Sequence, residues 1–504
     1  MPKYLLAHDL GTSGNKATLY TTEGQLVKSA VYSYDTRYFN QNWAEQNADD
    51  WWEAVCVTTR NIMEGINKED VLAVSFSGQM MGCLCVDKNG VPLRDAIIWA
   101  DMRAVQEAGA IKEKIGSQEF YRITGHRPSA SYSIEKLMWV KNHEPEIYRN
   151  TYKMLNAKDY IIYKLTGQFV TEYSDASGTN ALDLNTFEWS DDIIDASGID
   201  GDKLPVLKES TYVVGNVSSK VADEIGLSTK TAVVCGGGDG LCSAVGAGCV
   251  EEGIAYNYIG SSSWIAITTD KPIFDEKMRT FNWAHIIPGK ISPCGTMQAA
   301  GGSYSWLKNE ICKIECLQAE EKGVSPYDII NQAVEKSPVG ARGLIYLPYL
   351  MGERSPRWNP NARGGFIGLT MEHKREDLFR AVLEGVTMNL NIILGIFKEH
   401  EDIKEMIVIG GGAKGRVWRQ ILADVYGLKI LKPNYLEEAT SMGAAITAGV
   451  GIGVFKDFSV TDKFIRIEDV QQPTPSNQDK YRKMMDIFDS CYYALEDIFD
   501  KLSV

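Results

Sequence analysis

The chain has 504 residues, of which 44% are hydrophobic and 23% charged, and its formal net charge is −14. This acidic balance argues against nucleic acid and against an anionic membrane as partners, because both require a basic face on the protein. A prior of ~150 residues per domain gives about three domains, although large α/β domains make two equally plausible.

The cysteines and the N-terminus indicate the compartment. Ten cysteines occur without any CxxC pair, which argues against a disulfide framework and against a structural zinc site. We find neither a basic segment followed by an apolar signal core nor an apolar run of ~18 residues suited to a membrane span. We therefore expect a cytoplasmic protein with reduced, mostly buried thiols.

The first recognisable element is a β-hairpin over residues 4–20. Its turn has the sequence Asp9-Leu10-Gly11-Thr12-Ser13-Gly14-Asn15-Lys16. The glycines allow backbone N–H groups to close on a phosphate, and the Thr12 and Ser13 hydroxyls add donors. Asp9 is placed to hold Mg²⁺, usually through water, because that ion keeps several waters when it bridges phosphates. An ordinary Gly/Ser hairpin turn explains this octet alone equally well.

Residues 71–103 contain two strand ends that could carry binding groups. The first is the turn Gly78–Gly82 within a strand, turn, strand pattern, and the second is Trp99-Ala100-Asp101-Met102-Arg103 after a short strand. Turns fed by buried strands are where α/β proteins place ligand contacts. Core filling is the alternative for Met80 and Met81, and a surface ion pair at a helix start is the alternative for Asp101.

Helical spacing and turn residues mark several scaffold segments. Asp49 or Asp50 is the expected N-cap of a helix that begins at Trp51. Residues 134–142 predict a helix with Lys136 on a solvated flank. Residues 158–183 predict a short helix that ends at Gly167, followed by a polar loop that could face a cleft.

The strongest local signal in the middle of the chain is Cys235-Gly236-Gly237-Gly238-Asp239-Gly240, directly after the β-branched strand 231–234. Glycines allow the backbone to approach a ligand closely, and a carboxylate at the end of a strand can accept a proton. Asp239 could instead be a helix N-cap. Three consecutive glycines are more than a cap requires.

A second hairpin repeats the plan of the first. Residues 254–268 form an apolar strand, the turn Gly260–Ser263, and another apolar strand. The repeat indicates two related halves that each contribute one hairpin to a single nucleotide. Such an arrangement places the nucleotide in a cleft between the halves.

A third nucleotide-site candidate is the run Gly410-Gly411-Gly412-Ala413-Lys414-Gly415, which lies between the strand 406–409 and a helix over 417–426. A helix N-terminus with bare backbone can accept a base or a phosphate oxygen. The spacing is not GxGxxG, so dinucleotide binding is weakly supported. Further helices are expected over 376–398, over 437–455, where small residues suit close packing, and near 475–501.

Taken together, these residues resemble the FGGY carbohydrate kinases, from about residue 4 to about residue 455. Two family signatures are satisfied: Ser131-x-Ser133-x2-Lys136-Leu137-x-Trp139-Val140-x-Asn142-His143, and Gly364-x-Phe366-x-Gly368-Leu369 leading to Asp377-Leu378-x2-Ala381-Val382-Leu383-Glu384. The resemblance implies an α/β fold of two ribonuclease-H-like (actin-like ATPase) domains, each a mixed sheet flanked by helices. The expected domains are residues 1–248 and 249–504, with the active site in the cleft between them.

The resemblance also implies the cofactors, ATP and Mg²⁺, and the residues of the site. Asp239 matches the general base that accepts the proton of the substrate hydroxyl, and Asp9 is the expected metal-site residue. The expected sugar-site residues are Gln79, Met80, Met81, Trp99, Asp101 and Asp239. The expected ATP-site residues are Gly11, Thr12, Ser13, Lys16, Gly260, Ser261, Ser262, Gly411, Gly412, Ala413 and Lys414.

Within the family the sequence is most similar to the xylulokinase branch, which implies phosphorylation of a small neutral sugar, D-xylulose first, and small molecules as the partners. Three positions depart from that pattern: Met81 replaces a histidine, Gly240 replaces a common asparagine, and His8 precedes Asp9 where an aliphatic residue is usual. Kinases of L-xylulose, ribulose, erythritol or the autoinducer-2 class remain alternatives, as do a chaperone-like ATPase and a non-catalytic regulator. The sequence also leaves a homodimer open.

Overall fold

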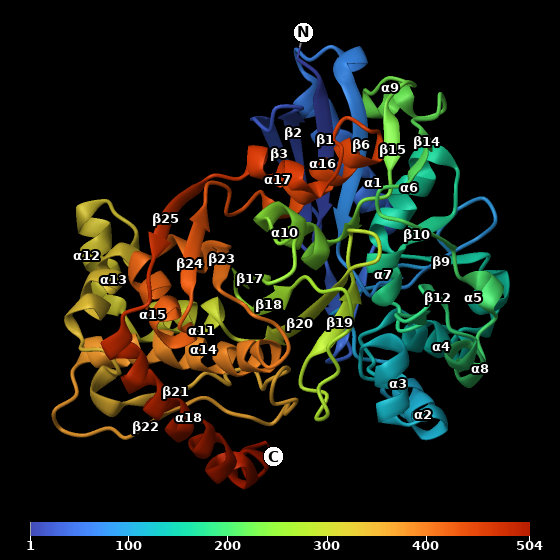
Figure 1. Cartoon of the computed structure of the whole chain (residues 1–504). Coiled ribbons are helices and arrows are strands. Elements are labelled where there is room, and N and C mark those ends of the chain that lie inside the picture. Colours follow the sequence, from blue (N-terminus) through green and yellow to red (C-terminus); the bar gives the residue numbers. More distant parts are fainter. Residues whose placement is uncertain (1, 504) are drawn as a thin grey trace.

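The computed structural model describes residues 2–503, and its first half is built on a seven-stranded mixed sheet (Figure 1). The strand order is β14 (Val213–Asn216), β15 (Ala232–Val234), β6 (Val71–Gly78), β1 (Tyr4–Leu10), β2 (Gly14–Thr21), β3 (Leu26–Ser33), with β16 (Gly237–Gly238) also paired to β6. β1 is antiparallel to β2 and parallel to β6. The predicted first hairpin is therefore the centre of this sheet.

The second half is built on another seven-stranded mixed sheet. Its order is β19 (Phe281–Ala284), β20 (Ile291–Met297), β18 (Ser263–Ile267), β17 (Ile254–Ile259), β23 (Glu405–Ile409), β24 (Lys429–Pro433), β25 (Ile467–Gln471). β17 is antiparallel to β18 and parallel to β23, and β24 is parallel to β23. The order β3-β2-β1-β6-β15-β14 of the first sheet is thus repeated as β20-β18-β17-β23-β24-β25, which confirms the predicted pair of related α/β halves.

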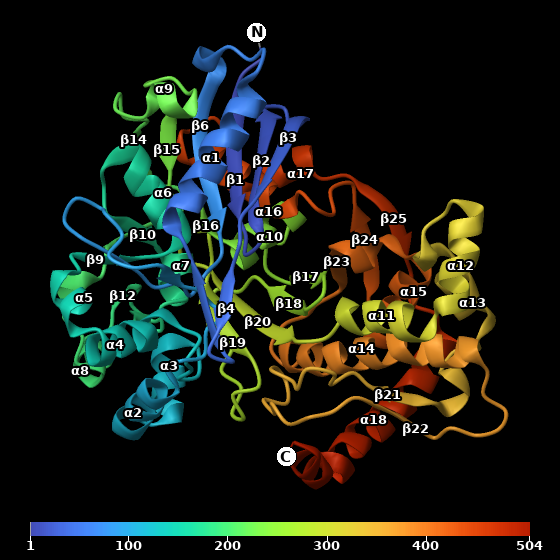
Figure 2. The same cartoon turned by 180° about the vertical axis from the view of Figure 1, so that it is seen from behind.

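Two helices meet where the halves join (Figures 1 and 2). α10 (Asp239–Ala247) packs against α16 (Ala439–Gly451), and α16 also lies on β1 and β6 of the first sheet. A Cβ atom added at Gly246 would lie 1.7 Å from the Ala439 carbonyl oxygen, and one added at Gly443 would lie 1.9 Å from that of Cys242. Small residues therefore permit backbone contact, as the sequence of 437–455 predicts.

The helix α16 bears on the proposed domain boundary. The division at residue 248 falls between α10 and β17, and each large sheet lies wholly on one side of it. However, α16 comes from the second half of the sequence and covers the first sheet. One core cluster accordingly contains Leu5 and Val234 of the first half together with Ile407 and Met442 of the second.

The remaining helices surround the two sheets. In the first half these are α1 (Ala48–Met63), α2 (Val105–Ile115), α3 (Ser117–Thr124), α4 (Ser133–His143), α5 (Pro145–Asn150), α6 (Ala157–Thr166), α7 (Tyr173–Ser177), α8 (Asp191–Ser197) and α9 (Ala222–Ile225). In the second half they are α11 (Gly301–Trp306), α12 (Lys313–Lys322), α13 (Pro326–Lys336), α14 (Arg375–Lys398), α15 (Arg416–Tyr426), α17 (Thr461–Phe464) and α18 (Pro475–Leu502). Short strands lie outside the main sheets: β4 (Arg37–Phe39), β5 (Trp43–Gln46), β7 (Leu84–Val86), β8 (Ala96–Ile97), β9 (Lys153–Leu155), β10 (Val170–Glu172), β11 (Leu182–Asp183), β12 (Glu188–Trp189), β13 (Val206–Lys208), β21 (Ile345–Leu347) and β22 (Gly365–Ile367).

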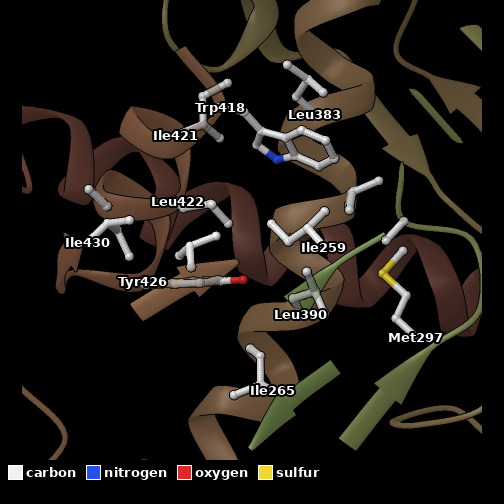
Figure 3. Packing of buried hydrophobic residues seen from close by; sticks show 14 of the residues in the cluster. Ile259, Ile265, Met297, Leu383, Leu390, Trp418, Ile421, Leu422, Tyr426 and Ile430 are labelled. Atoms are coloured by element: carbon white, nitrogen blue, oxygen red, sulfur yellow. The ribbon is translucent and has the colours of Figure 1, made fainter. Parts of the chain in front are cut away.

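The core of the second half forms around α14 and α15 (Figure 3). The Trp418 indole donates a hydrogen bond to the Thr387 hydroxyl at 3.1 Å, and the Tyr426 hydroxyl donates to the Asn257 amide oxygen at 3.1 Å. α14 is long and apolar enough to cross a membrane by length and composition, unlike the sequence expectation, but 78% of its most apolar window is buried inside the protein. We interpret α14 as a core helix.

Two local predictions need correction. α1 begins at Ala48 rather than Trp51, because the Asn47 side chain accepts the Asp49 N–H and is the N-cap. The polar stretch predicted as a loop after Gly167 instead contains β10 and α7. Most of its polar residues are buried, and the Glu172 carboxylate accepts hydrogen bonds from Ser174 and from the Asp175 N–H, so polarity here does not indicate exposure.

Candidate functional site

Three strand ends meet at one edge of the first sheet. Leu10 of β1 pairs with Gly78 of β6, which pairs with Gly238 of β16. The residue next to each of these ends is a predicted site residue: Asp9, Gln79 or Asp239. Strand register therefore brings together residues that are more than 200 positions apart in the sequence.

The turn of the first hairpin is fixed through its carbonyl groups. The Gly11 N–H donates to the Gly14 oxygen at 3.0 Å, the Tyr34 hydroxyl donates to the Gly11 oxygen, and the Gln46 amide donates to the Thr12 oxygen at 2.6 Å. Among residues 2–503, neither the Thr12 nor the Ser13 backbone N–H has a hydrogen-bond partner. These two amides remain available for an anion.

Asp9 and Lys16 face each other across this hairpin. They are register partners, and Asp9 also accepts a hydrogen bond from the Ser77 hydroxyl at 2.9 Å. Burial raises the pKa of Asp9, while Ser77 and Lys16 oppose the shift. The Lys16 ammonium donates to the Glu437 carbonyl at 3.1 Å and lies 3.6 Å from the Glu438 carboxylate. Lys16 therefore reaches from the first half to the segment that precedes α16.

Asp239 is the first residue of α10 and lies directly after β16. Its carboxylate accepts the Gly240 N–H at 2.7 Å. Burial, and secondly the negative charge of Asp9, raise the pKa of Asp239 to about 7. The N-cap position of α10 is Gly238 and not Asp239. The alternative prediction, that Asp239 is the N-cap of the helix, was therefore wrong.

A buried polar network holds the backbone at Asp239. The Gly238 N–H donates to the Ser174 hydroxyl at 2.9 Å, and that hydroxyl donates to the Glu172 carboxylate at 2.7 Å. A Cβ atom at Gly238 would lie 2.4 Å from the Met80 sulfur. A side chain at position 238 would therefore displace Met80, which packs against the strand.

In the turn after β6, the Met81 side chain is partly exposed, whereas those of Gln79 and Met80 are buried. The Gln79 amide donates to the Gln46 side chain at 2.7 Å, and both Gln79 and Met80 are buried. Met81 has a φ of 63° and a partly exposed side chain. Its carbonyl accepts the Lys136 ammonium at 2.7 Å. Lys136 is fully buried, so its prediction as a solvated flank was wrong.

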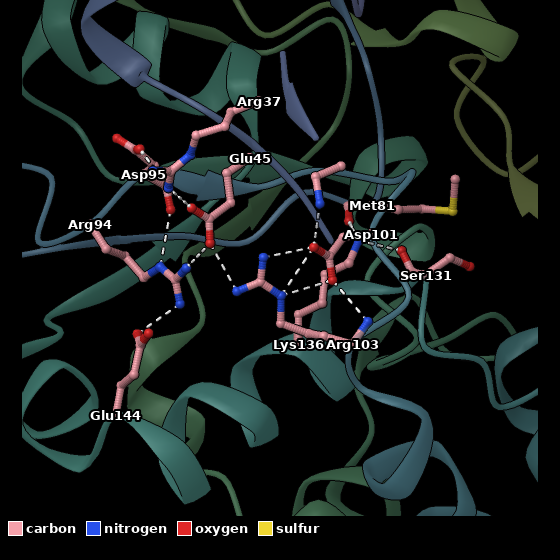
Figure 4. Close-up of polar contacts among 11 residues, drawn as sticks. Arg37, Glu45, Met81, Arg94, Asp95, Asp101, Arg103, Ser131, Lys136 and Glu144 are labelled. Carbon is pink, nitrogen blue, oxygen red and sulfur yellow. Dashed lines mark hydrogen bonds and ion pairs between the residues drawn. The ribbon is translucent and has the colours of Figure 1, made fainter. Parts of the chain in front are cut away.

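Trp99 and Asp101 differ in their availability to a ligand. Trp99 is 37% exposed, and its indole donates to the Thr12 hydroxyl at 2.8 Å. Asp101 is fully buried, with its carboxylate bonded to the Arg103 guanidinium and to the Ala44 N–H at 2.6 Å (Figure 4). The predicted Asp101–Arg103 pair exists, but it is an interior pair and not a surface one.

The second hairpin is fixed by the start of α11. The N–H groups of Ala300 and Gly302 donate to the Ser261 oxygen at 3.0 and 2.9 Å, and the Gly301 N–H donates to the Gly260 oxygen at 2.9 Å. A Cβ atom at Gly301 would lie 2.2 Å from that Gly260 oxygen. As in the first hairpin, carbonyl groups of the turn accept hydrogen bonds from neighbouring segments.

Aromatic residues connect the second hairpin to Asp239. The Tyr258 and Trp264 rings stack at 4.1 Å, and the Trp264 indole donates to the Tyr256 hydroxyl at 2.7 Å. That hydroxyl donates to the Gly240 carbonyl at 2.5 Å. Burial, followed by Asp9 and Asp239, raises the pKa of Tyr258. The two hairpins and the candidate base therefore lie in one neighbourhood.

The third predicted segment follows β23. Gly410 has a φ of 84°, and a Cβ atom there would lie 2.7 Å from the Ile259 oxygen. Residues Gly411–Lys414 form a short 3₁₀ helix in which Ala413 is buried. The Lys414 ammonium pairs with the Glu437 carboxylate at 2.5 Å. Lys16 and Lys414 thus both contact the segment before α16.

The chain was compared with known proteins. Models of the N-terminal and C-terminal domains of the FGGY family of carbohydrate kinases match residues 4–246 and 255–452. The chain belongs to this family. This FGGY kinase is 35% identical over 495 residues to a xylulose kinase of Staphylococcus epidermidis, covering 97% of this chain and 96% of that protein. It is 32% identical over 509 residues to a gluconokinase of Bacillus licheniformis, covering 100% and 98%.

Solved structures give the same family assignment. A gluconate kinase from Lactobacillus acidophilus matches with a TM-score of 0.93 and 27% identity over 100% of both chains. A ligand-bound xylulose kinase from the same organism matches with a TM-score of 0.92 and 27% identity, over 99% of this chain and 100% of that one. The FGGY kinase is therefore an ATP-dependent carbohydrate phosphotransferase with the two-domain fold that its sequence predicts.

Sequence reasoning missed several residues that shape the site. Ser174 and Glu172 support the strand before Asp239, Lys136 holds the Met81 carbonyl, and Tyr256 reaches Gly240. The polar run 168–183 was a visible signal for the first pair. His8, a departure from the family pattern, is buried between Asn15 and Thr59, and burial lowers its pKa to about 3. It is therefore an uncharged core residue.

Proposed function

We propose that this FGGY kinase transfers the γ-phosphoryl group of ATP to D-xylulose and forms D-xylulose 5-phosphate. The observation that carries the proposal is the position of Asp239, at the same sheet edge as Asp9 and in contact, through Gly240, with the second hairpin. The xylulose kinase relatives, which include that of Bacillus subtilis at 33% identity, support D-xylulose as the substrate.

In this proposal Asp239 is the general base. The substrate hydroxyl gives its proton to the Asp239 carboxylate as its oxygen attacks the γ-phosphorus. The bond from that phosphorus to the oxygen shared with the β-phosphate breaks, and ADP leaves. A pKa of about 7 suits this role, because a base works best when its pKa is near the operating pH.

The free amides of the first hairpin and the turn Gly260–Ser262 are proposed to hold the phosphates, and Gly411–Lys414 to hold the adenosine side. Lys16 and Lys414 are expected to exchange their contacts with the segment before α16 for phosphate oxygens when ATP binds. Positioning supplies much of the rate in phosphoryl transfer, since little covalent chemistry is required of the protein.

The chemistry of Asp9 fits the magnesium ion that accompanies ATP. Its carboxylate is partly exposed, accepts one hydrogen bond, from Ser77, and has no ion-pair partner among residues 2–503. Within residues 2–503 there is no group of three His, Cys, Asp or Glu side chains that could hold a metal ion. The ion would therefore depend on Asp9, the phosphates and water. When bound, it would offset charge on the transferring phosphoryl group.

On the sugar side, Met81 and Trp99 are the proposed residues with exposed surface for substrate contact. Met80 shapes the wall beside Gly238. Asp101 contributes as part of the hydrogen-bonded frame, because its carboxylate is already bonded to Arg103. Gln79 donates its amide N–H to Gln46, but its amide oxygen has no partner among residues 2–503 and is available to accept a substrate hydroxyl.

A second candidate substrate is gluconate. The relatives named gluconokinase are 31% and 32% identical, nearly as similar as the xylulose kinases, and one of the matching structures is a gluconate kinase. Gluconate carries a carboxylate that D-xylulose lacks, so the two candidates differ in the charge that the sugar site must accept.

The test is ADP release with Mg-ATP across D-xylulose, D-gluconate, L-xylulose, ribulose, erythritol and the autoinducer, with Asp239→Asn as the blank. The proposal expects the largest kcat/KM with D-xylulose. A larger value with gluconate, or with any other compound, would replace the substrate and leave the kinase assignment unchanged. ADP release that a peptide stimulates without sugar phosphorylation would instead favour a chaperone-like ATPase.

The variant Met81→His sharpens this test. The side chain at position 81 is partly exposed, and a histidine there would supply a hydrogen-bonding group to the sugar site. We expect the substitution to change the ranking of the ketoses in the same assay. An unchanged ranking would remove position 81 from substrate selection.

A further inference from the structure

A cavity of ≈ 470 Å³ lies apart from the proposed catalytic residues. It is open to solvent and is lined by Arg127 of the first half, the segment before β19 at Lys277 and Arg279, the loop at Trp358, and the C-terminal helix α18. None of its lining residues is among the proposed sugar, ATP or metal residues. Its volume falls within the range of ~300–1,000 Å³ that small-molecule sites occupy.

One wall of this cavity carries two cations without acidic partners. The Arg127 guanidinium lies 4.9 Å from the centre of the Trp358 ring and donates to the carbonyls of Met278 and Lys277, both at 2.8 Å. Neither Arg127 nor Lys277 forms an ion pair within residues 2–503. By contrast, Arg279 is paired with Asp275 at 2.6 Å. Arg127 and Lys277 therefore have no direct ion-pair partner among residues 2–503, and Asp275 acts on them only at longer range.

The part of the lining that comes from α18 includes Asp486, Asp489 and Glu496 together with two tyrosine rings. Asp489 is paired with Arg357 at 2.7 Å, and Glu496 accepts the Tyr492 hydroxyl at 3.2 Å. The remaining carboxylate oxygens are acceptors only, which suits a ligand that offers several hydroxyl donors.

The three features together select one kind of ligand. Two cations without direct ion-pair partners suit a phosphate, the aromatic surface of Trp358 suits the apolar face of a sugar, and carboxylates accept sugar hydroxyls. We propose that this cavity binds a small phosphorylated sugar, with its phosphate on Arg127 and Lys277 and its hydroxyls donating to Asp486 and Glu496. This binding does not depend on which sugar the enzyme phosphorylates.

The position of the cavity gives the binding a consequence. Arg127 belongs to the first half of the chain, whereas Lys277, Trp358 and α18 belong to the second. A phosphorylated sugar would therefore contact both halves at once, outside the catalytic residues.

The test is isothermal titration calorimetry of the full chain with D-glucose 6-phosphate, inorganic phosphate and D-glucose as probes. The variants are Lys277→Glu and, as the matched control, Lys271→Glu. Both lysines are exposed and lie in the same stretch of chain, but only Lys277 lines the cavity. A second variant, Arg127→Gln, removes the other cation, and its melting curve reports whether the chain remains folded.

We expect glucose 6-phosphate to bind the wild type at least ten-fold more tightly than glucose or inorganic phosphate. We expect at least ten-fold weaker binding by Lys277→Glu and by folded Arg127→Gln, and no change in Lys271→Glu. Equal affinity of Lys277→Glu and the wild type would overturn the proposal, because the ligand would then be bound elsewhere. Equal binding of phosphate and glucose 6-phosphate would overturn the assignment of a sugar.

Discussion

The two large sheets have the same strand order, but the turns of their corresponding hairpins, β1–β2 and β17–β18, carry different chemical groups. The turn region of the first half carries a carboxylate and an ammonium, Asp9 and Lys16, and Asp239 directly follows strand β16 of the same sheet. The turn of the second half carries Gly260 and two serines, and its fixed groups are backbone atoms bonded to the start of α11.

This difference indicates that the two halves, although they share one topology, have different roles at the site. Charged groups that can bind a metal or accept a proton are concentrated on the first half. The second half offers backbone and hydroxyl groups, with stacked rings behind them. Substitutions in the first half should therefore change chemistry and pH dependence, whereas those in the second should change backbone geometry and nucleotide affinity.

The strongest test of this division is Asp239→Asn. We expect turnover to fall by roughly 10²–10⁴-fold, because the proposed general base is lost, while the affinity for ATP is retained. Steady-state kinetics and nucleotide titration measure the two quantities separately. Near-wild-type turnover would show that the charged half does not hold the base.

The same variant makes a stability prediction. The pKa of Asp239 is raised to about 7 in the folded protein, so ionising this carboxyl opposes folding above its unfolded pKa of 3.8. Asp239→Asn should therefore raise the melting temperature at pH 8, with a difference that disappears near pH 3. A lower melting temperature at pH 8 would contradict this reasoning.

A smaller effect is expected on the pKa values within the first half. The negative charge of Asp9 contributes to the raised pKa of Asp239, so Asp9→Asn should lower that pKa. Carbon-13 NMR of the Asp239 carboxyl, in protein free of nucleotide and metal, measures the shift. An unchanged or higher pKa would show that the two carboxylates do not interact.

In the second half, Gly410→Ala tests the role of backbone geometry. Gly410 has a φ of 84° and lies against the Ile259 carbonyl, so alanine should cost about 1–3 kcal/mol of folding free energy. The matched variant Gly411→Ala has no atom within 4 Å of its added Cβ and should leave stability unchanged. Urea unfolding compares the two, and equal losses would contradict the backbone requirement.

The smallest effect expected is that of Trp99→Phe. It removes the hydrogen bond from the indole to the Thr12 hydroxyl, which joins the sugar side to the first hairpin. Loss of one such bond corresponds to a ~2- to 10-fold decrease in kcat/KM. A loss as large as that in Asp239→Asn would mean that Trp99 has a part in the chemistry itself.

Several features were predictable because their signals are local. Both hairpins and the glycine runs before Asp239 and at Gly410 are short segments whose turn residues impose their geometry. The hairpin turns were therefore located from sequence, and the repeat indicated the paired halves.

Other features depend on contacts between distant segments, and periodicity does not reveal them. Lys136 looks solvent-facing on its helix, yet the Met81 and Ser131 carbonyls lie within 2.7 and 2.5 Å of its ammonium. The sequence spacing of Asp101 and Arg103 is typical of a surface ion pair. In the folded protein Arg103 also pairs with Glu45, and Asp101 also accepts the Ala44 N–H, so the pair is buried. The position of α16 on the first sheet likewise follows from tertiary packing, which no local pattern encodes.

The crossing of α10 and α16 has a mechanical consequence. At Gly246 and Gly443 the helices contact each other through main-chain atoms. Main-chain atoms cannot change rotamer as side chains can, so the two helices cannot easily slide along each other. Each helix is also attached to the strands of its own half, through β16 and β24. If the halves rotate relative to each other, this crossing should be the hinge, and the displacements should be largest in the parts of the molecule farthest from it.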